Sequence, residues 1–341
     1  MMRFTFVAGA ALAALASPAL ADHAGPSGAG SGSGLDVFAP DTLDEGHGAV
    51  GLRILYTQPD YRSDAELEAL AAQHVHAHNT DYNLNASASV AYGVTHRLTV
   101  SAELPYLRRD NLREGEHSHS GGIATNEVER LGTVSGIGDL NLLAKYRLTG
   151  EEGVRFAVIG GIKAPTGSTH KRDPGGERLE TEHQPGTGSW DPIVGASAAV
   201  KAGLVGLTAS ALYQFAGKGP QDTRLGDRMQ GGISVSHHFG EPPEAEQRHE
   251  HGEDEHHHHE AHDSWDAFVE LGGEWEGRQE IAGAVEKGSG GAWVYAAPGL
   301  RFNSRAGWSA AAAIAVPLWQ HIRQSHPDND FRAMLSFGKS F

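Results

Sequence analysis

The sequence predicts an all-β protein, a transmembrane antiparallel β-barrel of about 12 strands that is preceded by a cleaved signal peptide. Three observations lead to this prediction. The chain begins with an export signal, most of the remainder consists of segments in which apolar and polar residues alternate, and the connections between these segments alternate between short and long. Together these features indicate a protein of the bacterial outer membrane.

The first 21 residues have the parts of a secretory signal peptide. Arg3 precedes the apolar run "FTFVAGAALAALA", and Ala19 and Ala21 fit the A-x-A cleavage pattern. A short membrane anchor is the alternative, but the run is too short to cross roughly 30 Å of hydrocarbon. We therefore expect a signal peptide over residues 1–21 and a flexible, Gly/Ser-rich leader over residues 22–47.

The composition excludes several classes of protein. The chain has no cysteine, so an exported protein of this kind has no disulfide framework. Beyond the signal peptide no apolar stretch approaches about 18 residues, so we expect no transmembrane helix. The net charge is −16 and no basic patch is present, which argues against nucleic acid as a partner.

Alternation with a period of two predicts the strands. In "GAVGLRILYTQP", Val50, Leu52 and Ile54 share one face, whereas Gly51 and Arg53 share the other. A helix would need apolar residues at i, i+3 and i+4, which these segments lack. We expect strands over residues 48–57, 82–92, 97–106, 137–148, 154–164, 190–201, 203–216, 227–239, 264–276, 289–302, 307–317 and 328–341.

The connections predict the orientation of the barrel, which we expect over residues 48–341. Short turns such as "GVTH" and "NSRAG" alternate with long loops at 58–81, 107–136 and 165–189. In outer-membrane barrels the short turns face the periplasm and the long loops face outside. The terminal Phe341 on an alternating strand resembles the assembly signal of such proteins. A soluble β-sandwich also alternates, but it needs neither this asymmetry nor a terminal Phe.

Five phrases resemble those of a known family. "YGVTHRLTVSAELPY", "GIGDLNLLAKYRL", "GGIKAPTGS", "PGTGSWDPIVG" and "VPLWQ" occur in this order. They resemble the transporter-like outer-membrane barrels of the MetA-pathway of phenol degradation family. The resemblance implies a barrel with a role in the uptake of small, often aromatic or apolar, molecules. It supports the architecture more strongly than the solute.

The polar faces of the strands are expected to line the lumen, where opposite charges can pair across the barrel. We expect a lumen this narrow to be occluded by side chains and by the leader. The candidate pore-lining residues are Arg53, Arg97, Glu103, Asp139, Lys145, Arg147, Arg155, Lys163, Asp266, Glu270 and Glu274.

The chain has 21 histidines, and many are clustered. Imidazole beside carboxylate suits Zn²⁺, Cu²⁺, Ni²⁺ and Co²⁺. We expect divalent ions bound loosely and no required cofactor; the alternatives are solvated linkers and a pH-responsive polyelectrolyte. The candidate ligands are His74, His76, His78, His117 and His119 outside the cell, and His249, His251, His256, His257, His258, His259 and His262 in a His/Glu-rich periplasmic insertion at 240–263.

No catalytic motif is present: the sequence lacks G-x-S-x-G, H-E-x-x-H, a P-loop and a cysteine nucleophile, so we expect no enzyme. The sequence favours an outer-membrane channel-like barrel for a small solute, with its histidines involved in divalent metal binding or transport. Its expected partners are outer-membrane lipid, the solute and a periplasmic protein. One alternative is uptake of apolar or aromatic compounds with incidental histidines, and another is a surface-binding barrel without transport.

Overall fold

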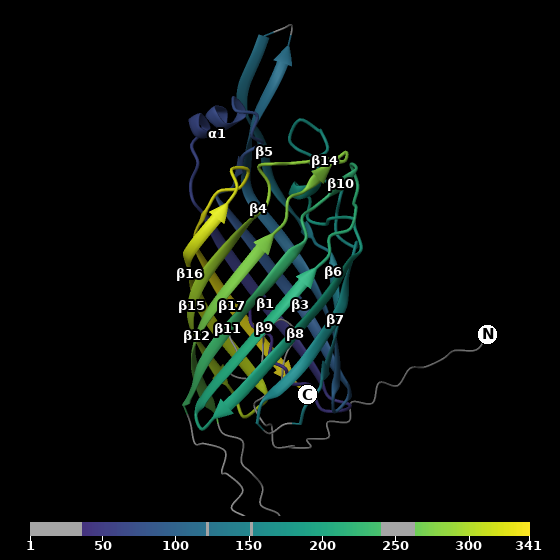
Figure 1. Cartoon of the computed structure of the whole chain (residues 1–341), viewed down its shortest axis with the longest axis vertical. Coiled ribbons are helices and arrows are strands. Elements are labelled where there is room, and N and C mark those ends of the chain that lie inside the picture. The colour runs from purple at the N-terminus through teal and green to yellow at the C-terminus, as the bar shows by residue number, and fades with distance from the viewer. Residues whose placement is uncertain (1–35, 121–122, 151–152, 240–262) are drawn as a thin grey trace, which may run out of the picture.

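The computed structural model describes residues 36–120, 123–150, 153–239 and 263–341. These residues form a closed barrel of 12 antiparallel strands. Figure 1 shows this barrel from the side. The predicted fold class is therefore confirmed. The predicted signal peptide, the first part of the leader and almost all of the His/Glu-rich insertion lie outside the described residues.

The barrel strands follow one another around the wall in chain order. They are β1 (Gly48–Pro59), β3 (Tyr82–Thr95), β4 (Leu98–Ser120), β6 (Leu140–Arg147), β7 (Arg155–Ala164), β8 (Asp191–Ala202), β9 (Val205–Gln214), β11 (Arg228–Phe239), β12 (Ser264–Glu276), β15 (Gly291–Asn303), β16 (Trp308–Ile322) and β17 (Asn329–Ser340). The connections contain α1 (Asp64–Ala71), β2 (His78–Asn79), β5 (Ile123–Ile137), η2 (Thr181–His183), β10 (Thr223–Arg224), β13 (Glu280–Ile281) and β14 (Ala284–Val285).

Pairing between the first and last strands closes the barrel. On β1, Leu52 lies opposite Ala88 of β3 on one side and Phe337 of β17 on the other. Closure leaves no sheet edge, and hydrocarbon tolerates no unpaired backbone. Leu52 and Leu335 point outward and are 58% and 53% exposed in the isolated chain, as expected of side chains that contact lipid. Within the described residues, no helix is long and apolar enough to span a membrane.

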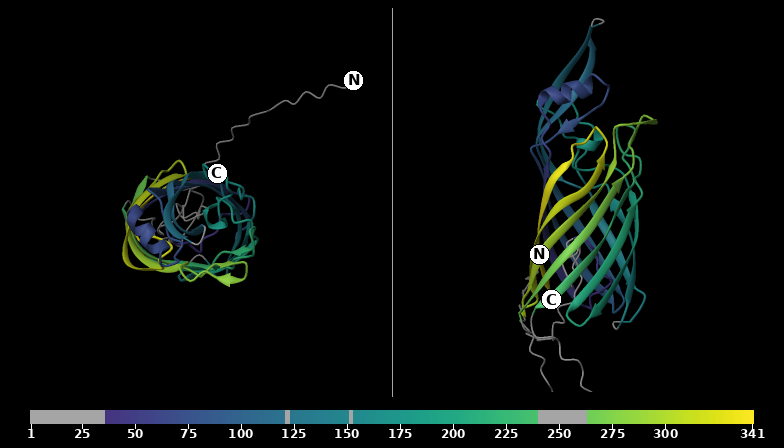
Figure 2. Two further views of the ribbon diagram at one scale, coloured as in Figure 1. Left: turned by 90° about the horizontal axis from the view of Figure 1, so that it is seen from above. Right: turned by 60° about the vertical axis from the view of Figure 1, so that its left-hand side comes forward.

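All three predicted long loops contain regular structure, and the third contains η2. Residues 107–136 were expected to be a loop, but β4 continues to Ser120 and pairs with β5, so a hairpin projects above the barrel (Figure 1). The first long loop contains α1, which begins with a capping box in which Ser63 and Glu66 bond each other's backbone. The view from above in Figure 2 shows α1 at the rim of the barrel.

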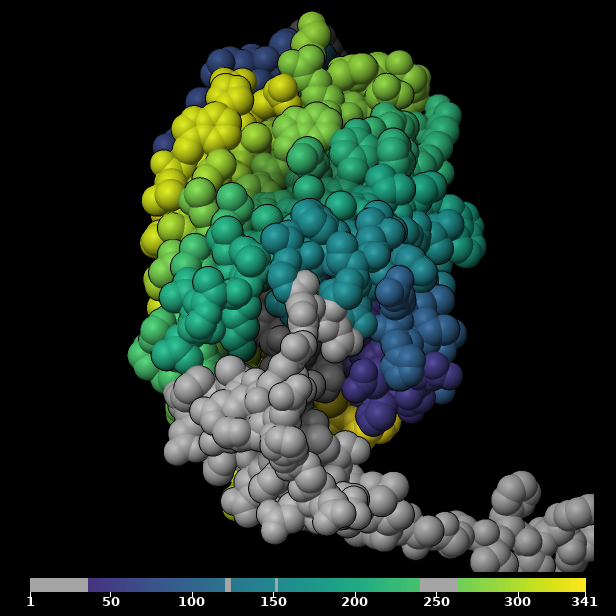
Figure 3. Space-filling model, turned by 60° about the horizontal axis from the view of Figure 1, so that its bottom comes forward, coloured from purple at the N-terminus to yellow at the C-terminus, as the bar shows by residue number. Residues whose placement is uncertain are grey.

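Residues 36–43 lie inside the lumen. Asp36 forms an ion pair with Arg53 and accepts a hydrogen bond of 2.9 Å from the Tyr295 hydroxyl. Lys145 donates to the Ala39 carbonyl at 2.9 Å, and Asp41 pairs with Arg155. The chain then leaves at the lower rim, where Gly46 donates to the Gly93 carbonyl at 2.9 Å. Figure 3 shows that rim, with the start of the described chain in purple. This part of the predicted flexible leader is therefore a fixed, buried segment.

Glycines on the inner wall make room for this segment. A Cβ at Gly232 would lie 3.1 Å from Cγ2 of Val37, and one at Gly272 would lie 2.5 Å from the ring of Tyr295. Val37 is buried, with 1% of its surface exposed. The wall of β11 and β12 is therefore shaped to hold residues 36–43 and the Tyr295 side chain that binds them.

We predict that the substitution Asp36→Ala loosens this segment and raises the conductance of the barrel in planar lipid bilayers. Removing one partner of a largely buried ion pair costs about 3–5 kcal/mol, because the other charge is left uncompensated. Asp44→Ala is the matched control, because Asp44 directly follows the segment and is exposed. Equal conductance of the two variants would contradict the role given to Asp36.

Candidate metal centre at the extracellular end

Most of the predicted lumen residues point into the barrel and pair there. Glu274 binds Arg332 at 2.6 Å, and Lys163 binds Asp191 at 2.5 Å. The inward-facing predicted residues are Arg53, Glu103, Lys145, Arg147, Arg155, Lys163, Asp266, Glu270 and Glu274.

Two of the predicted lumen residues lie outside the strands. Arg97 was expected in the lumen, but it is exposed in the β3–β4 turn because β4 begins one residue later. Asp139 precedes β6 and accepts backbone hydrogen bonds from Gly167 at 2.9 Å and Thr187 at 2.8 Å. Asp139 therefore anchors the third long loop to the extracellular rim.

The short helix η2 in this third loop is the point where the extracellular connections meet. Thr181 donates a hydrogen bond of 3.1 Å to the Pro220 carbonyl, and Glu182 accepts one of 2.8 Å from Gln279. His183 lies 3.2 Å from a carboxylate oxygen of Glu114 on β4. η2 thus joins the loops after β7, β9 and β12 to the projecting hairpin.

The first and last loops join the same assembly through His78. Its ring lies 4.8 Å from that of His183 and 4.6 Å from that of His326, measured between centroids. The backbone N–H of His78 donates to the Ser325 carbonyl at 3.0 Å, and Arg62 donates to the His326 carbonyl at 2.6 Å. The loops form one connected cap at the extracellular end.

Imidazole and carboxylate groups converge at the centre of this cap. His78, Glu182 and His183 form one group whose ligand atoms all lie within 4.8 Å of one another. Glu114, Glu180, Glu182 and His183 form a second, overlapping group with the same spacing. We call these five residues the inner cluster. They combine the ligand types that Zn²⁺ and related ions use in proteins.

The surroundings of the inner cluster resemble those of a metal site. His183 and Glu114 are buried, with 1% and 8% of their surfaces exposed. The Nδ1 atom of His78 is buried and has no hydrogen-bond partner in the part of the chain that is described. An unpaired buried nitrogen costs about 1–3 kcal/mol, and coordination to an ion would satisfy it. Gln279, bonded to Glu182, would orient that ligand from outside the coordination sphere.

Strand pairing explains part of this arrangement. β2 pairs with β4 so that His78 lies directly opposite Glu114, and side chains directly opposite in an antiparallel pair share one face. The sequence analysis singled out His76 and His78, and His76 lies 3.9 Å from Glu114. It missed Glu114, Glu180, Glu182 and His183 as ligands. The available signal was the stretch "ETEH" at 180–183, which places two acids and a histidine together in a loop.

The two histidines of the inner cluster have opposite electrostatic environments. Burial disfavours the charged form of His183, but the hydrogen bond with Glu114 and the charges of Glu182 and Glu114 outweigh it, so the pKa of His183 is raised. Burial, followed by the positive charges of His326 and His183, holds the pKa of His78 well below its usual range. His78 therefore stays neutral to a lower pH than His183 does.

The other predicted extracellular ligands lie apart from the inner cluster. His117 and His119 on β4 bring their Nε2 atoms to 3.2 Å, and the ring of His74 lies 4.3 Å from that of His117. Because His74 has a left-handed backbone with φ of +59°, the H-x-H-x-H motif is divided between two clusters. The predicted ligands His249, His251, His256, His257, His258, His259 and His262 lie outside the described residues.

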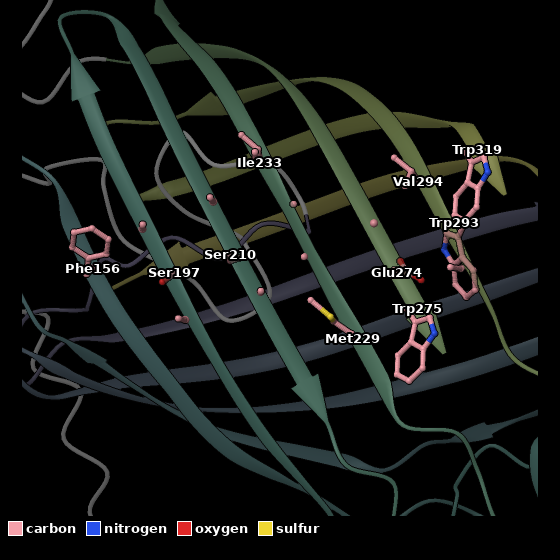
Figure 4. Close-up of a pocket in the computed structure, with 18 residues that line it drawn as sticks. Phe156, Ser197, Ser210, Met229, Ile233, Glu274, Trp275, Trp293, Val294 and Trp319 are labelled. Atoms are coloured by element: carbon pink, nitrogen blue, oxygen red, sulfur yellow. The ribbon is translucent and has the colours of Figure 1, made fainter. Parts of the chain in front are cut away.

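A hollow of about 670 Å³ marks the outer wall over β8, β9, β11, β12 and β15. Small residues such as Ala209 and Gly231 form its floor. In Figure 4, Trp275 and Trp319 lie at one end and Phe156 at the other. The lining is almost entirely apolar, so this hollow offers an apolar surface toward the membrane.

The fold defines a transmembrane β-barrel of the bacterial outer membrane, built as channel-like barrels are. A family model described as "Putative MetA-pathway of phenol degradation" matches residues 41–262, and the chain belongs to this family. No curated protein matches it in sequence.

The chain was also compared with solved structures, and those below are all outer-membrane proteins. The COG4313 outer membrane channel from Pseudomonas putida F1 superposes with a TM-score of 0.54 at 17% identity, over 88% of this chain and 97% of that one. The monoaromatic hydrocarbon channel TodX, as a deletion mutant, gives 0.43 at 12% identity, over 94% and 100% of the two chains. The NanC porin gives 0.41 at 6% identity, over 85% and 98%. At 17% identity, the likeness to the COG4313 channel shows a shared fold and nothing more.

We predict that Glu114→Gln lowers the pKa of His183, because it removes the negative charge of its hydrogen-bond partner. The raised pKa of the wild type gives stability that is fully present below the unfolded-state value of about 6.5 and is lost as pH rises through the native value. In the variant, the pH-dependent contribution of His183 to the free energy of unfolding should be smaller. NMR titration of isotope-labelled histidines measures the pKa of His183 in the wild type and the variant. Glu116→Gln is the control, because Glu116 lies on the same strand but is exposed. Identical His183 titrations in both variants would refute the assigned cause.

Proposed function

We propose that this protein is a non-catalytic outer-membrane channel that binds a divalent transition-metal ion at its extracellular mouth and admits it to the lumen. One observation carries the proposal: chain segments far apart in sequence bring imidazoles and carboxylates together in two overlapping groups that share Glu182 and His183, with the ligand atoms of each group within 4.8 Å of one another. No further cofactor is needed for this function.

Charge supports a cationic solute. The three carboxylates Glu114, Glu180 and Glu182 lie close together, and a cation bound between them would relieve the repulsion between their like charges. The net charge of the chain is negative, which favours a cationic over an anionic solute. The inner cluster therefore offers both long-range attraction and short-range coordination.

The position of the cluster supports a role at the entrance. η2 contacts the loops that follow β9 and β12 and the hairpin of β4 and β5, so an ion bound there lies at the junction of the cap. Below the cap, the lumen holds further carboxylates, among them Glu103, Glu270 and Glu274.

A second candidate function is the uptake of apolar or aromatic compounds. The apolar hollow on the outer wall favours it, because such a surface would accept a hydrocarbon from the membrane. In that case the inner cluster would stabilise the cap and would have no part in selecting the solute. A surface-binding barrel without transport is a third candidate, favoured by the buried segment 36–43 in the lumen.

We predict that His183→Ala weakens the binding of Zn²⁺ by at least roughly 10–100-fold, the loss that even changes next to a ligand produce. Isothermal titration of the refolded full-length protein measures it. The background replaces the seven histidines between residues 249 and 262 by asparagine, so that this segment does not mask the inner cluster. His170→Ala is the matched control, because His170 lies exposed in the same loop as His183.

Transport is measured in liposomes that contain a Zn²⁺ indicator. Zn²⁺ entry should depend on the barrel and fall in His183→Ala but not in His170→Ala. Entry of an aromatic solute with no entry of Zn²⁺ would replace the metal proposal by the second candidate. Entry of neither solute would favour the third.

A further inference from the structure

The upper part of the β4–β5 hairpin has a second group of imidazoles, on the face that α1 covers. A Cβ at Gly115 would lie 2.4 Å from the Leu67 carbonyl of α1, so the face that includes Gly115, His117 and His119 is directed toward the helix. Glu114 belongs to the opposite face, which meets η2. The hairpin therefore separates this group, His74, His117 and His119, from the inner cluster. We call it the outer cluster.

The spacing within the outer cluster is that of two metal ligands. The Nε2 atoms of His117 and His119 are 3.2 Å apart. Two imidazole nitrogens that share a tetrahedral ion at about 2.0–2.1 Å lie about 3.3 Å from each other. The strand geometry produces this pair, because residues two apart on an extended strand point to the same side.

A neighbouring residue holds the required tautomer. Nδ1 of His117 lies 2.6 Å from Oδ1 of Asn126, which is its cross-strand partner on β5. Since an amide oxygen only accepts hydrogen bonds, Nδ1 carries the proton and Nε2 of the neutral ring carries a lone pair. This lone pair is directed at Nε2 of His119. A second group that fixes the ligand in this way is typical of histidine metal sites.

His74 supplies a third imidazole from a different element. It follows α1 and is held by the hydrogen bond from its N–H to the Ala71 carbonyl, at 2.9 Å. Its left-handed backbone, with φ of +59°, directs its side chain to the hairpin, where its ring lies edge-on to His117 with centroids 4.3 Å apart. Outside glycine such a conformation is uncommon and costs free energy. Here it brings the ring of His74 to His117.

We propose that His117 and His119 hold a second transition-metal ion, in a site made of imidazoles alone and open to solvent above the inner cluster, and that His74, whose ring packs edge-on against His117, completes this site by turning its side chain. Ligand chemistry distinguishes the two sites. An all-imidazole site suits Cu²⁺, Ni²⁺ and Zn²⁺, with the highest affinity for Cu²⁺. The carboxylates of the inner cluster also accept harder ions such as Mn²⁺. Metal binding by the outer cluster does not depend on transport. Only its role as the first binding site for an incoming ion rests on the proposed function.

The test uses Cu²⁺ as the probe and removes the competing ligands from the full-length chain. The background combines His183→Ala with asparagine at the seven histidines between residues 249 and 262. One equivalent of Cu²⁺ should bind with an electron paramagnetic resonance spectrum showing nitrogen couplings from two or three imidazoles. His117→Ala combined with His119→Ala should abolish this signal.

Two milder variants test the geometry without changing the pair. Asn126→Ala should weaken Cu²⁺ binding by about 10–100-fold, because His117 loses the group that fixes its tautomer. His74→Ala should remove one imidazole coupling. His170→Ala, which removes an exposed histidine from the third loop, should leave the spectrum unchanged.

If the histidines form only a hydrogen-bonded pair, the background protein will show no imidazole-coupled Cu²⁺ beyond that of the His117/His119 double variant. That result would overturn the proposal. It would leave the Zn²⁺ titration of the inner cluster unaffected, so failure of the outer site and failure of the proposed function are separate outcomes.

Discussion

The closure of the sheet is the constraint on which the rest of the structure depends. β1 must pair with β17, because an unpaired strand edge inside hydrocarbon would leave its N–H and C=O groups without partners. Closure collects the longer connections at one rim, where they can contact one another across the opening. The same constraint encloses the lumen, so residues 36–43 can be buried between charged side chains from several strands.

The loops of the cap bring candidate metal ligands from distant parts of the chain together. η2 is only three residues long, yet its side chains reach the loops around it, and the pairing of His78 with Glu114 adds the first loop. Buried charges are tolerated only when they are paired, hydrogen-bonded or bound to an ion. In the inner cluster Glu114 and His183 are buried, Glu182 is half-buried and Glu180 is exposed, and the buried Nδ1 atom of His78 is without a partner within the described chain. A bound cation would resolve both features at once.

The sequence was informative where the environment imposes a period of two. Lipid outside and polar side chains inside produced the alternation from which all 12 barrel strands were predicted. Because alternate residues of a strand point to opposite faces, the same pattern placed residues such as Glu270 and Arg155 in the lumen. The upper hairpin of β4 and β5 was missed because water reaches much of both its faces, so residues 107–136 carry no apolar alternation. Helix α1 is short, although its capping box from Ser63 to Glu66 was a readable signal.

The candidate site was predicted only in part, because its geometry depends on contacts between distant segments. Clustered histidines indicated metal, but their partners Glu114 and Glu182 are single acids in a chain with 43 acidic residues. The division of H-x-H-x-H between two clusters arises from one backbone angle at His74. Burial of residues 36–43 depends on glycines across the barrel, such as Gly232, which a Gly/Ser-rich leader does not reveal.

The most direct measurement is X-ray diffraction from crystals of the full-length protein soaked in Zn²⁺, with data collected on both sides of the zinc absorption edge. An anomalous difference map locates the ion without any assumption about its ligands. The account predicts a peak between His78, Glu182 and His183, at coordination distances of about 2.0–2.2 Å. Peaks confined to other surface histidines, with the inner cluster empty, would contradict it.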